Sequence, residues 1–120
     1  MNGETEFKVE ERNGIPVVGV IGALDHCNVP KFRSIISDLI AMGHKSIVVD
    51  MSETDFMDSG GMSGVIHGLK LLFEAGGRLF LANCNSRIMH KLRISGFTTM
   101  PDKLGICDSL ENAVSSVGPE

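Results

Sequence analysis

Ser59 is the side chain with the clearest chemical potential in this sequence. It lies in the segment Phe56-Met57-Asp58-Ser59-Gly60-Gly61-Met62, between an apolar run that ends near Asp50 and a helical pattern that opens at Met62. A serine hydroxyl at a helix start can cap free backbone N–H groups, accept a phosphoryl group, or act as a nucleophile beside a base. The two glycines that follow it permit close backbone approach by a partner.

Phosphorylation of Ser59 would add about −1.5 to −2 charges beside Asp58, close to an acidic loop. The helix N-terminus would partly accommodate the phosphate, because its dipole and free amides favour negative charge. A protein partner that has to desolvate this surface would be repelled. One modification could therefore leave the fold intact and abolish one interaction. The same local pattern is also that of a plain N-cap serine.

Nucleophilic catalysis by Ser59 has little support in the surrounding residues. The sequence Asp-Ser-Gly-Gly resembles the nucleophile segment of trypsin-like proteases, but those enzymes have Gly before the Asp and usually Pro after the glycines. Here Met57 and Met62 occupy these positions, and Met57 also breaks the G-x-S-x-G turn of α/β-hydrolases. No segment for a base and its orienting group is recognisable. We therefore expect no enzymatic activity, with a small serine hydrolase as a remote alternative.

The elements that must position Ser59 alternate between strand and helix patterns. The first half is predicted to form a hairpin turning at Asn13-Gly14 into a strand over 15–21, a helix from the cap Asn28 to Gly43, and a strand over 46–50. The second half is predicted to form a helix from Met62 to Gly76-Gly77, a strand over 78–82, a helix from the cap Ser86 to Gly96, and a weak strand near 97–100. A last helix, which Asp108 and Glu111 begin as a capping box, is followed by a frayed tail over 117–120.

This alternation predicts an α/β fold. Right-handed crossovers should give a mixed, largely parallel central sheet of about 4–5 strands with about 4 helices packed against it. In such a sheet the loops at the carboxyl ends of strands collect functional groups. Two predicted loops, residues 22–28 and 51–61, lie at such ends and are the candidate functional segments.

Composition restricts the classes of partner. The chain has 120 residues, 42% of them hydrophobic, which fits a single domain over residues 1–120. A net charge of −4 and an aromatic content of 5% oppose nucleic-acid binding. No signal-like N-terminus and no apolar run long enough for a membrane helix is visible, so we expect a soluble cytoplasmic protein without a membrane partner.

Cysteines and histidines give no pattern of a metal or disulfide site. Cys27, Cys84 and Cys107 are odd in number and form no C-x-x-C pair, which favours reduced thiols. The four histidines lack ligand spacing, and His26-Cys27 in one loop is a poor chelate. The glycines after Ser59 lack the lysine of a phosphate-binding P-loop. We therefore expect no metal and no cofactor.

Several short motifs, at agreeing spacings along nearly the whole chain, carry a family resemblance. Gly22-Ala23-Leu24-Asp25 matches a G-x-[LI]-D loop, and Phe56-Met57-Asp58-Ser59 matches an F-M-D-S phosphorylation segment. Gly76-Gly77 and Ser95-Gly96-Phe97 match later G-G and S-G-[LF] marks. In these motifs the chain resembles the anti-sigma-factor antagonists, single-domain bacterial STAS proteins whose founding members act in sporulation and stress responses.

The resemblance implies a partner switch. The unmodified protein would bind an anti-sigma factor with serine kinase activity and relieve its inhibition of a sigma factor. That factor would phosphorylate Ser59, and a metal-dependent serine phosphatase would restore the hydroxyl. The implied partner-binding residues come from the two loops and the following helix start: Asp25, His26, Asn28, Asp58, Ser59, Gly60, Met62 and Ser63.

Some positions depart from the family pattern. Gly60 stands where many relatives have Ser or Thr, while Ser63 and Gly64 stand where a glycine and then a branched apolar residue are common. These departures alter the expected shape of the interface but keep the acceptor. An alternative stays open: a STAS adaptor module in another signalling or transport assembly, in which Ser59 is never phosphorylated.

Overall fold

The computed structural model describes residues 4–95 and 104–117. Six strands and four helices follow one another in this part of the chain: β1 (Glu6–Arg12), β2 (Ile15–Leu24), α1 (Val29–Ala41), β3 (Ser46–Asp50), β4 (Thr54–Met57), α2 (Ser59–Glu74), β5 (Arg78–Ala82), α3 (Ser86–Ile94), β6 (Leu104–Cys107) and α4 (Leu110–Val117). The predicted closure of the third helix at Gly96, the weak strand near 97–100 and the tail at 118–120 lie outside the described residues.

The strands form one mixed sheet in the order β1-β2-β3-β5-β6, with β4 paired to β2 off this path. Only the β1–β2 pair is antiparallel among the described strands; β2–β3, β2–β4, β3–β5 and β5–β6 are all parallel. The predicted α/β class and the largely parallel sheet are therefore confirmed. The predicted hairpin turn is also found, with Asn13 and Gly14 at φ values of 54° and 80°.

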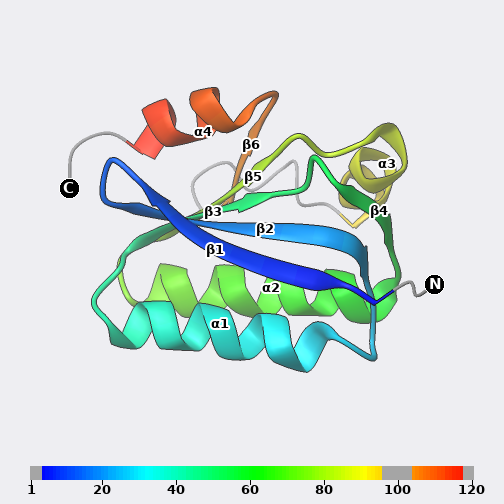
Figure 1. Ribbon diagram of the computed structural model, residues 1–120, viewed down its shortest axis with the longest axis horizontal. Coiled ribbons are helices and arrows are strands. Elements are labelled where there is room, and N and C mark those ends of the chain that lie inside the picture. The colour runs from blue at the N-terminus through cyan, green and yellow to red at the C-terminus, as the bar shows by residue number, and fades with distance from the viewer. Residues whose placement is uncertain (1–3, 96–103, 118–120) are drawn as a thin grey trace.

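Helices cover both faces of the sheet (Figure 1). The helices α1 and α2 run side by side along one face, and α4 lies on the other. β3 has the continuous apolar run of a central parallel strand, and Ile47, Val48 and Val49 are all 0% exposed. Val49 packs toward α1 and α2, whereas Val48 belongs to the smaller cluster beneath α4. The two helical layers thus bury both faces of the same strand.

The strand β4 corrects the prediction of a continuous loop over residues 51–61. Thr54 is buried, and its hydroxyl donates a hydrogen bond to the carbonyl of Val20 at 2.7 Å. Leu24 in β2 lies opposite Met57 in β4. A strand of four residues with Asp55 and Phe56 both exposed shows too little alternation to stand out in the sequence.

The strand β6 was also missed by the sequence prediction. It contains Gly105, a residue that usually weakens a strand. The structure shows the reason for a glycine here, because a Cβ at this position would lie 2.4 Å from the Phe80 ring. Close packing against a neighbouring aromatic side chain therefore explains a residue that otherwise suggests a turn.

In three helices the capping residue lies one position away from the predicted cap. Asp58 caps α2 in place of Ser59, Asn85 caps α3 in place of Ser86, and the Ser109 hydroxyl accepts the Asn112 N–H at α4. The α2 helix accordingly begins at Ser59 rather than Met62. In α2 and α3 the capping residue keeps an extended backbone, from which its side chain reaches the N–H three residues ahead.

Candidate functional site

The pairing of β4 with β2 places the loop after β2 against the first turn of α2. The Asp58 N–H points to the Leu24 carbonyl at 3.4 Å. A Cβ on Gly61 would lie 2.0 Å from that carbonyl oxygen, and a Cβ on Gly60 would lie 2.6 Å from the Cβ of His26. The two glycines therefore allow a close approach, as their type indicated, but the segment that approaches is the protein's own loop.

Hydrogen bonds within the loop after β2 fix its shape. Asp25 Oδ1 accepts the N–H groups of Cys27 at 2.9 Å and Asn28 at 3.1 Å. The Asn28 amide donates to Thr5 Oγ1 and to the Ala23 carbonyl, both at 2.9 Å. Asn28 occupies the N-cap position of α1 without a side-chain capping bond to that helix. Asp25 and Asn28, both predicted as partner contacts, thus have an internal role in shaping the loop.

Asp58 joins the loop to the helix electrostatically. Its Oδ1 accepts the Gly61 N–H at 2.9 Å, and its Oδ2 is 3.1 Å from His26 Nδ1. The Gly61 backbone N–H, and after it the His26 side chain, lower the pKa of Asp58 from 3.8 to about 2. Asp58 is therefore ionised at neutral pH, directly before Ser59 in the chain.

Ser59 is exposed at the first position of α2. Within the part of the chain that the structure describes, its hydroxyl makes no hydrogen bond, since Asp58 provides the cap. Beside it lies a shallow hollow of about 210 Å³ between the start of α2 and the end of α3, lined by Asp58, Ser59, Met62, Lys91, Ile94 and Ser95. The hydroxyl therefore does not stabilise the helix start, and an approaching molecule can reach it.

The other predicted contacts differ in accessibility. His26 is exposed, with 77% of its side-chain surface accessible, whereas Met62 is only 9% exposed and mainly fills the core. Ser63 lies exposed one turn further along α2, where its hydroxyl accepts a hydrogen bond from Arg33 Nη2 at 3.0 Å. The structure therefore brings His26 and Ser59 to one surface, with Met62 beneath it.

Residues of β4 and α3 complete this surface and were missed by the sequence prediction. Lys91 donates a hydrogen bond to the Met57 carbonyl, and its Nζ lies 5.0 Å from the centroid of the Phe56 ring. Phe56 and Ile94 are exposed apolar side chains, at 48% and 71%. Helical periodicity predicts the helix that carries Lys91, but it does not indicate which residue of another element that lysine meets.

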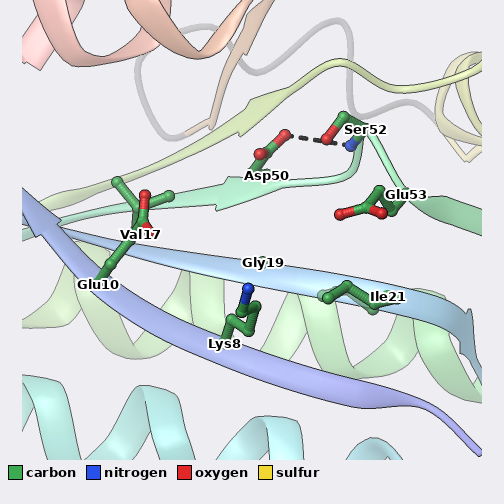
Figure 2. A pocket seen from close by; sticks show the side chains of 9 residues that line it. Lys8, Glu10, Val17, Gly19, Ile21, Asp50, Ser52 and Glu53 are labelled. Atoms are coloured by element: carbon green, nitrogen blue, oxygen red, sulfur yellow. Dashed lines mark hydrogen bonds between the residues drawn. The ribbon is translucent and has the colours of Figure 1, made fainter.

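A second hollow, of about 130 Å³, lies on the face of the sheet that α4 partly covers (Figure 2). It forms where β1, β2 and β3 run together and Gly19 carries no side chain. Lys8 and the carboxylates of Glu10, Asp50 and Glu53 line it, and the Ser52 N–H donates to Asp50 Oδ1 at 3.1 Å. This hollow is separate from the surface around Ser59, with which it shares no lining residue.

Residues 4–95 and 104–117 contain neither a candidate metal site nor a helix that could span a membrane. No three His, Cys, Asp or Glu side chains of these residues are grouped closely enough to hold a metal ion. None of the helices that these residues form has the length and apolar character needed to cross a membrane.

Comparison with known proteins gives consistent similarities along nearly the whole chain. The STAS domain family model matches residues 6–113. The sequence is 27% identical over 114 residues to an anti-sigma F factor antagonist of Paenibacillus polymyxa, covering 93% of this chain and 94% of that protein. The fold is similar to that of the anti-sigma factor antagonist SpoIIAA in its unphosphorylated form, with a TM-score of 0.71, 26% identity, and coverage of 92% of this chain and 96% of that one. For the Bacillus cell fate determinant SpoIIAA in the phosphorylated form the TM-score is 0.74, with 26% identity over 93% of this chain and 99% of that one.

Proposed function

This chain belongs to the STAS domain family, and from that premise we propose that it is a partner-switching anti-sigma factor antagonist controlled by phosphorylation of Ser59. When unphosphorylated it binds an anti-sigma factor that is also a serine kinase, and this binding relieves the inhibition of a sigma factor. The kinase transfers the γ-phosphoryl group of ATP to the Ser59 hydroxyl. A metal-dependent serine phosphatase then restores the binding form.

The proposal rests on one observation: Asp58 caps the helix, and Ser59 does not. Asp58 caps α2, so the exposed Ser59 hydroxyl can be modified without removing a hydrogen bond that the fold uses. A phosphate at the first helical position also lies near backbone N–H groups that have no intrahelical partner. Modification of Ser59 is therefore compatible with an unchanged fold.

Charge around Ser59 supports an effect on docking rather than on folding. Asp58 is ionised at neutral pH, since its pKa is lowered to about 2. A phosphate would add about −1.5 to −2 charges beside this carboxylate. The exposed Phe56 and Ile94 are apolar area that a partner can bury, and a dianion at their border must then be desolvated or left unpaired. We infer that Ser59, His26 and Asp58 lie on the docking surface together with Lys91 and Ile94.

The geometry offers no comparable support for hydrolysis by Ser59. His26 lies close to Asp58 and to Cys27, at 3.1 and 3.5 Å, rather than to the Ser59 hydroxyl. Among the described residues Ser59 therefore has no imidazole base within hydrogen-bond distance. This arrangement suits a phosphate acceptor better than a nucleophile.

The test is phosphate transfer from the cognate kinase. The protein is incubated with the anti-sigma factor of the same organism and Mg-ATP, and intact mass and peptide mapping then locate any phosphate. We expect one phosphoryl group on Ser59 and none on the Ser59→Ala protein. Ser86→Ala is the matched control, because Ser86 is also exposed at the first position of a helix, and it should be phosphorylated like the parent. Absence of transfer to Ser59 from any cognate kinase would favour the adaptor role instead.

A further inference from the structure

The Cys27 thiol and the His26 imidazole, on the loop after β2, and the Asp58 carboxylate, at the start of α2, are joined by two successive contacts. Cys27 Sγ is 3.5 Å from His26 Nε2, and His26 Nδ1 is 3.1 Å from Asp58 Oδ2. Cys27 and His26 are exposed, while the Asp58 side chain keeps 26% of its accessible surface. A nucleophile, a base and a carboxylate that orients the base is the order of groups found in nucleophilic catalysis.

The loop is held in the conformation that makes these contacts. Asp25 Oδ1 accepts the N–H of Cys27 at 2.9 Å, which fixes the backbone that carries the thiol. Gly60 lies against the backbone of His26, where a Cβ would be 2.7 Å from the His26 Cα. Asp58 is held in turn by the Gly61 N–H at 2.9 Å. The thiol, the imidazole and the carboxylate are thus each held by a contact of their own with the fold.

The Asp58 contact determines which nitrogen of the neutral His26 imidazole carries the proton. An ionised carboxylate can only accept hydrogen bonds, so when the imidazole is neutral the contact favours the tautomer with the proton on His26 Nδ1. The lone pair of Nε2 is then directed to the Cys27 side. In this state His26 can accept the thiol proton while the sulfur attacks an electrophile.

The other two cysteines have different surroundings. Cys84 is partly buried, with its sulfur 3.8 Å from Met51 Sδ, and burial raises its pKa to about 11. Cys107 Sγ is 4.0 Å from the Ser116 hydroxyl. Among the described residues neither thiol has an imidazole at hydrogen-bond distance. The structure therefore distinguishes Cys27 from two internal reference thiols.

We propose that Cys27 is a modification site that undergoes thiol–disulfide exchange with small disulfides of the glutathione disulfide class. Cys27 Sγ attacks one sulfur of the disulfide, the disulfide S–S bond breaks, and a mixed disulfide forms at Cys27. The thiol proton passes to His26 Nε2 and then to the departing thiolate, which leaves as a free thiol. The small disulfide is the oxidant, and the exchange requires no other.

The modification has a consequence for docking that rests on the proposed function. Cys27 is adjacent to His26, whose backbone contacts Gly60 at the start of α2. A glutathione group on Cys27 would therefore project beside the docking surface around Ser59. It would exclude the anti-sigma factor by its bulk even while Ser59 is unphosphorylated.

The first experiment measures the rates of the three thiols in the full chain. Reduced protein is incubated with excess glutathione disulfide at neutral pH, quenched with acid at intervals, and mapped by peptide mass spectrometry. We expect Cys27 to form the mixed disulfide about tenfold faster than Cys107, a modest effect for general base catalysis because the site is open to water. A Cys27 rate equal to or below that of Cys107 overturns the proposal.

Substitutions of the base test its role. His26→Gln should lower the ratio of the Cys27 rate to the Cys107 rate about tenfold. His67→Gln makes the same chemical change at an exposed position on α2 and should leave this ratio unchanged. Asp58→Asn retains an oxygen that can cap Gly61 but no longer fixes the imidazole tautomer, so the ratio should fall several-fold. A ratio in His26→Gln as high as in the parent contradicts the assignment of the base.

A separate measurement addresses docking. Affinity for the anti-sigma factor is compared for reduced and glutathionylated protein, and again after treatment with dithiothreitol. We expect at least a tenfold loss on modification, recovery on reduction, and no sensitivity to disulfide in Cys27→Ser. If Cys27 exchanges as described but affinity is unaffected, the thiol site stands and the docking surface is misplaced. If Cys27 fails to exchange, the thiol site is overturned whatever the affinity of the unmodified protein.

Discussion

The starts of α2 and α3 are built alike and differ in what surrounds them. In both, an Asx side chain accepts the N–H three residues ahead at 2.9 Å, and an exposed serine follows, Ser59 in α2 and Ser86 in α3. Asn85 uses its remaining amide group to donate to the Thr54 carbonyl at 3.1 Å. Asp58 instead directs a charged oxygen to the exposed His26.

The third helical position extends this difference. In α3 it is Ile88, which is 1% exposed and anchors the helix in the core. In α2 it is Gly61, which has no side chain because the Leu24 carbonyl occupies that space. One helix start is closed by a neutral cap and an apolar anchor, whereas the other holds a charged carboxylate, a loop and a free hydroxyl. A helix cap followed by an exposed serine therefore does not by itself indicate a switch. The residues that surround the serine distinguish the two helix starts.

The largest expected effect separates the two serines. Ser59→Asp should weaken binding to the anti-sigma factor about 100-fold, because it places a second carboxylate in a surface that the partner must desolvate. Ser86→Asp makes the same change at the matching position of α3 and should bind like the parent. Calorimetric titration measures both affinities. Equal affinity of Ser59→Asp and the parent would rule out electrostatic exclusion.

Both aspartate variants should remain folded. A negative charge in the first turn is favourable to the helix dipole, so circular-dichroism spectra and melting curves should be those of the parent or slightly more stable. If Ser59→Asp loses its melting transition, its loss of binding reflects unfolding. The Ser59→Ala protein then decides, since it should bind its partner even after incubation with kinase and ATP.

Gly61 provides the next largest effect. Gly61→Ala should lower the free energy of unfolding by about 2 kcal/mol, because its Cβ must displace the Leu24 carbonyl. Gly68→Ala in the same helix is the control, since its Cβ would meet Ile36 Cγ2 at 3.5 Å, an ordinary contact. Urea unfolding compares the two. A Gly61→Ala protein as stable as Gly68→Ala would show that the loop is not pressed against α2.

Removing either cap should have a smaller effect. Asp58→Ala and Asn85→Ala should each lower Tm by roughly 2–6 °C, as expected for loss of one N-cap in a domain of this size. The two losses should respond differently to salt. The charged cap also interacts with the helix dipole, which salt screens, so only the Asp58→Ala loss should shrink at high ionic strength. Identical salt dependence would contradict the assignment of a charged cap.

Acid pH gives the smallest and most specific difference. The pKa of Asp58 is lowered to about 2 in the folded protein from 3.8, so its contribution to stability is full above about pH 4 and is lost as the pH falls toward 2. The Tm difference between the parent and Asp58→Asn should therefore shrink over this range. The difference between the parent and Asn85→Ala should not, because asparagine does not titrate. A constant Asp58→Asn difference would contradict the shifted pKa.

The fold could be predicted from sequence where periodicity and turn residues agree. The run 46–50 gave the buried central strand, and Gly43 and Gly76, at φ values of 98° and 84°, mark the ends of α1 and α2 as expected. β4 was not predicted because Thr54, a polar residue, is buried there. Its hydroxyl donates a hydrogen bond to the Val20 carbonyl, a tertiary contact that the sequence does not reveal. β6 was not predicted because glycine usually weakens a strand. The reason for Gly105 is its close packing against the Phe80 ring, which only the structure shows.

The site was predictable as a pair of loops but not as a surface. Short motifs indicated Ser59 and the segment around Asp25, and the structure places both near the start of α2. Asp58 and Ser59 are adjacent, and both are residue types that cap helices. Which of them caps α2 depends on their backbone angles, which the sequence does not specify. The contacts of Lys91 with Met57 and Phe56, and of Cys27 with His26, arise from how separate elements meet and from the loop's folded shape.

The switch proposed for this protein is docking controlled by a single phosphate on Ser59, with no change in the fold. Its most direct test is the affinity of the purified protein for its anti-sigma factor in three preparations: unmodified, phosphorylated on Ser59, and phosphorylated then treated with the serine phosphatase. We expect tight binding, binding weaker by about 100-fold, and tight binding again. Equal affinities in the first two preparations, with the phosphate confirmed on Ser59, would show that phosphorylation does not control docking.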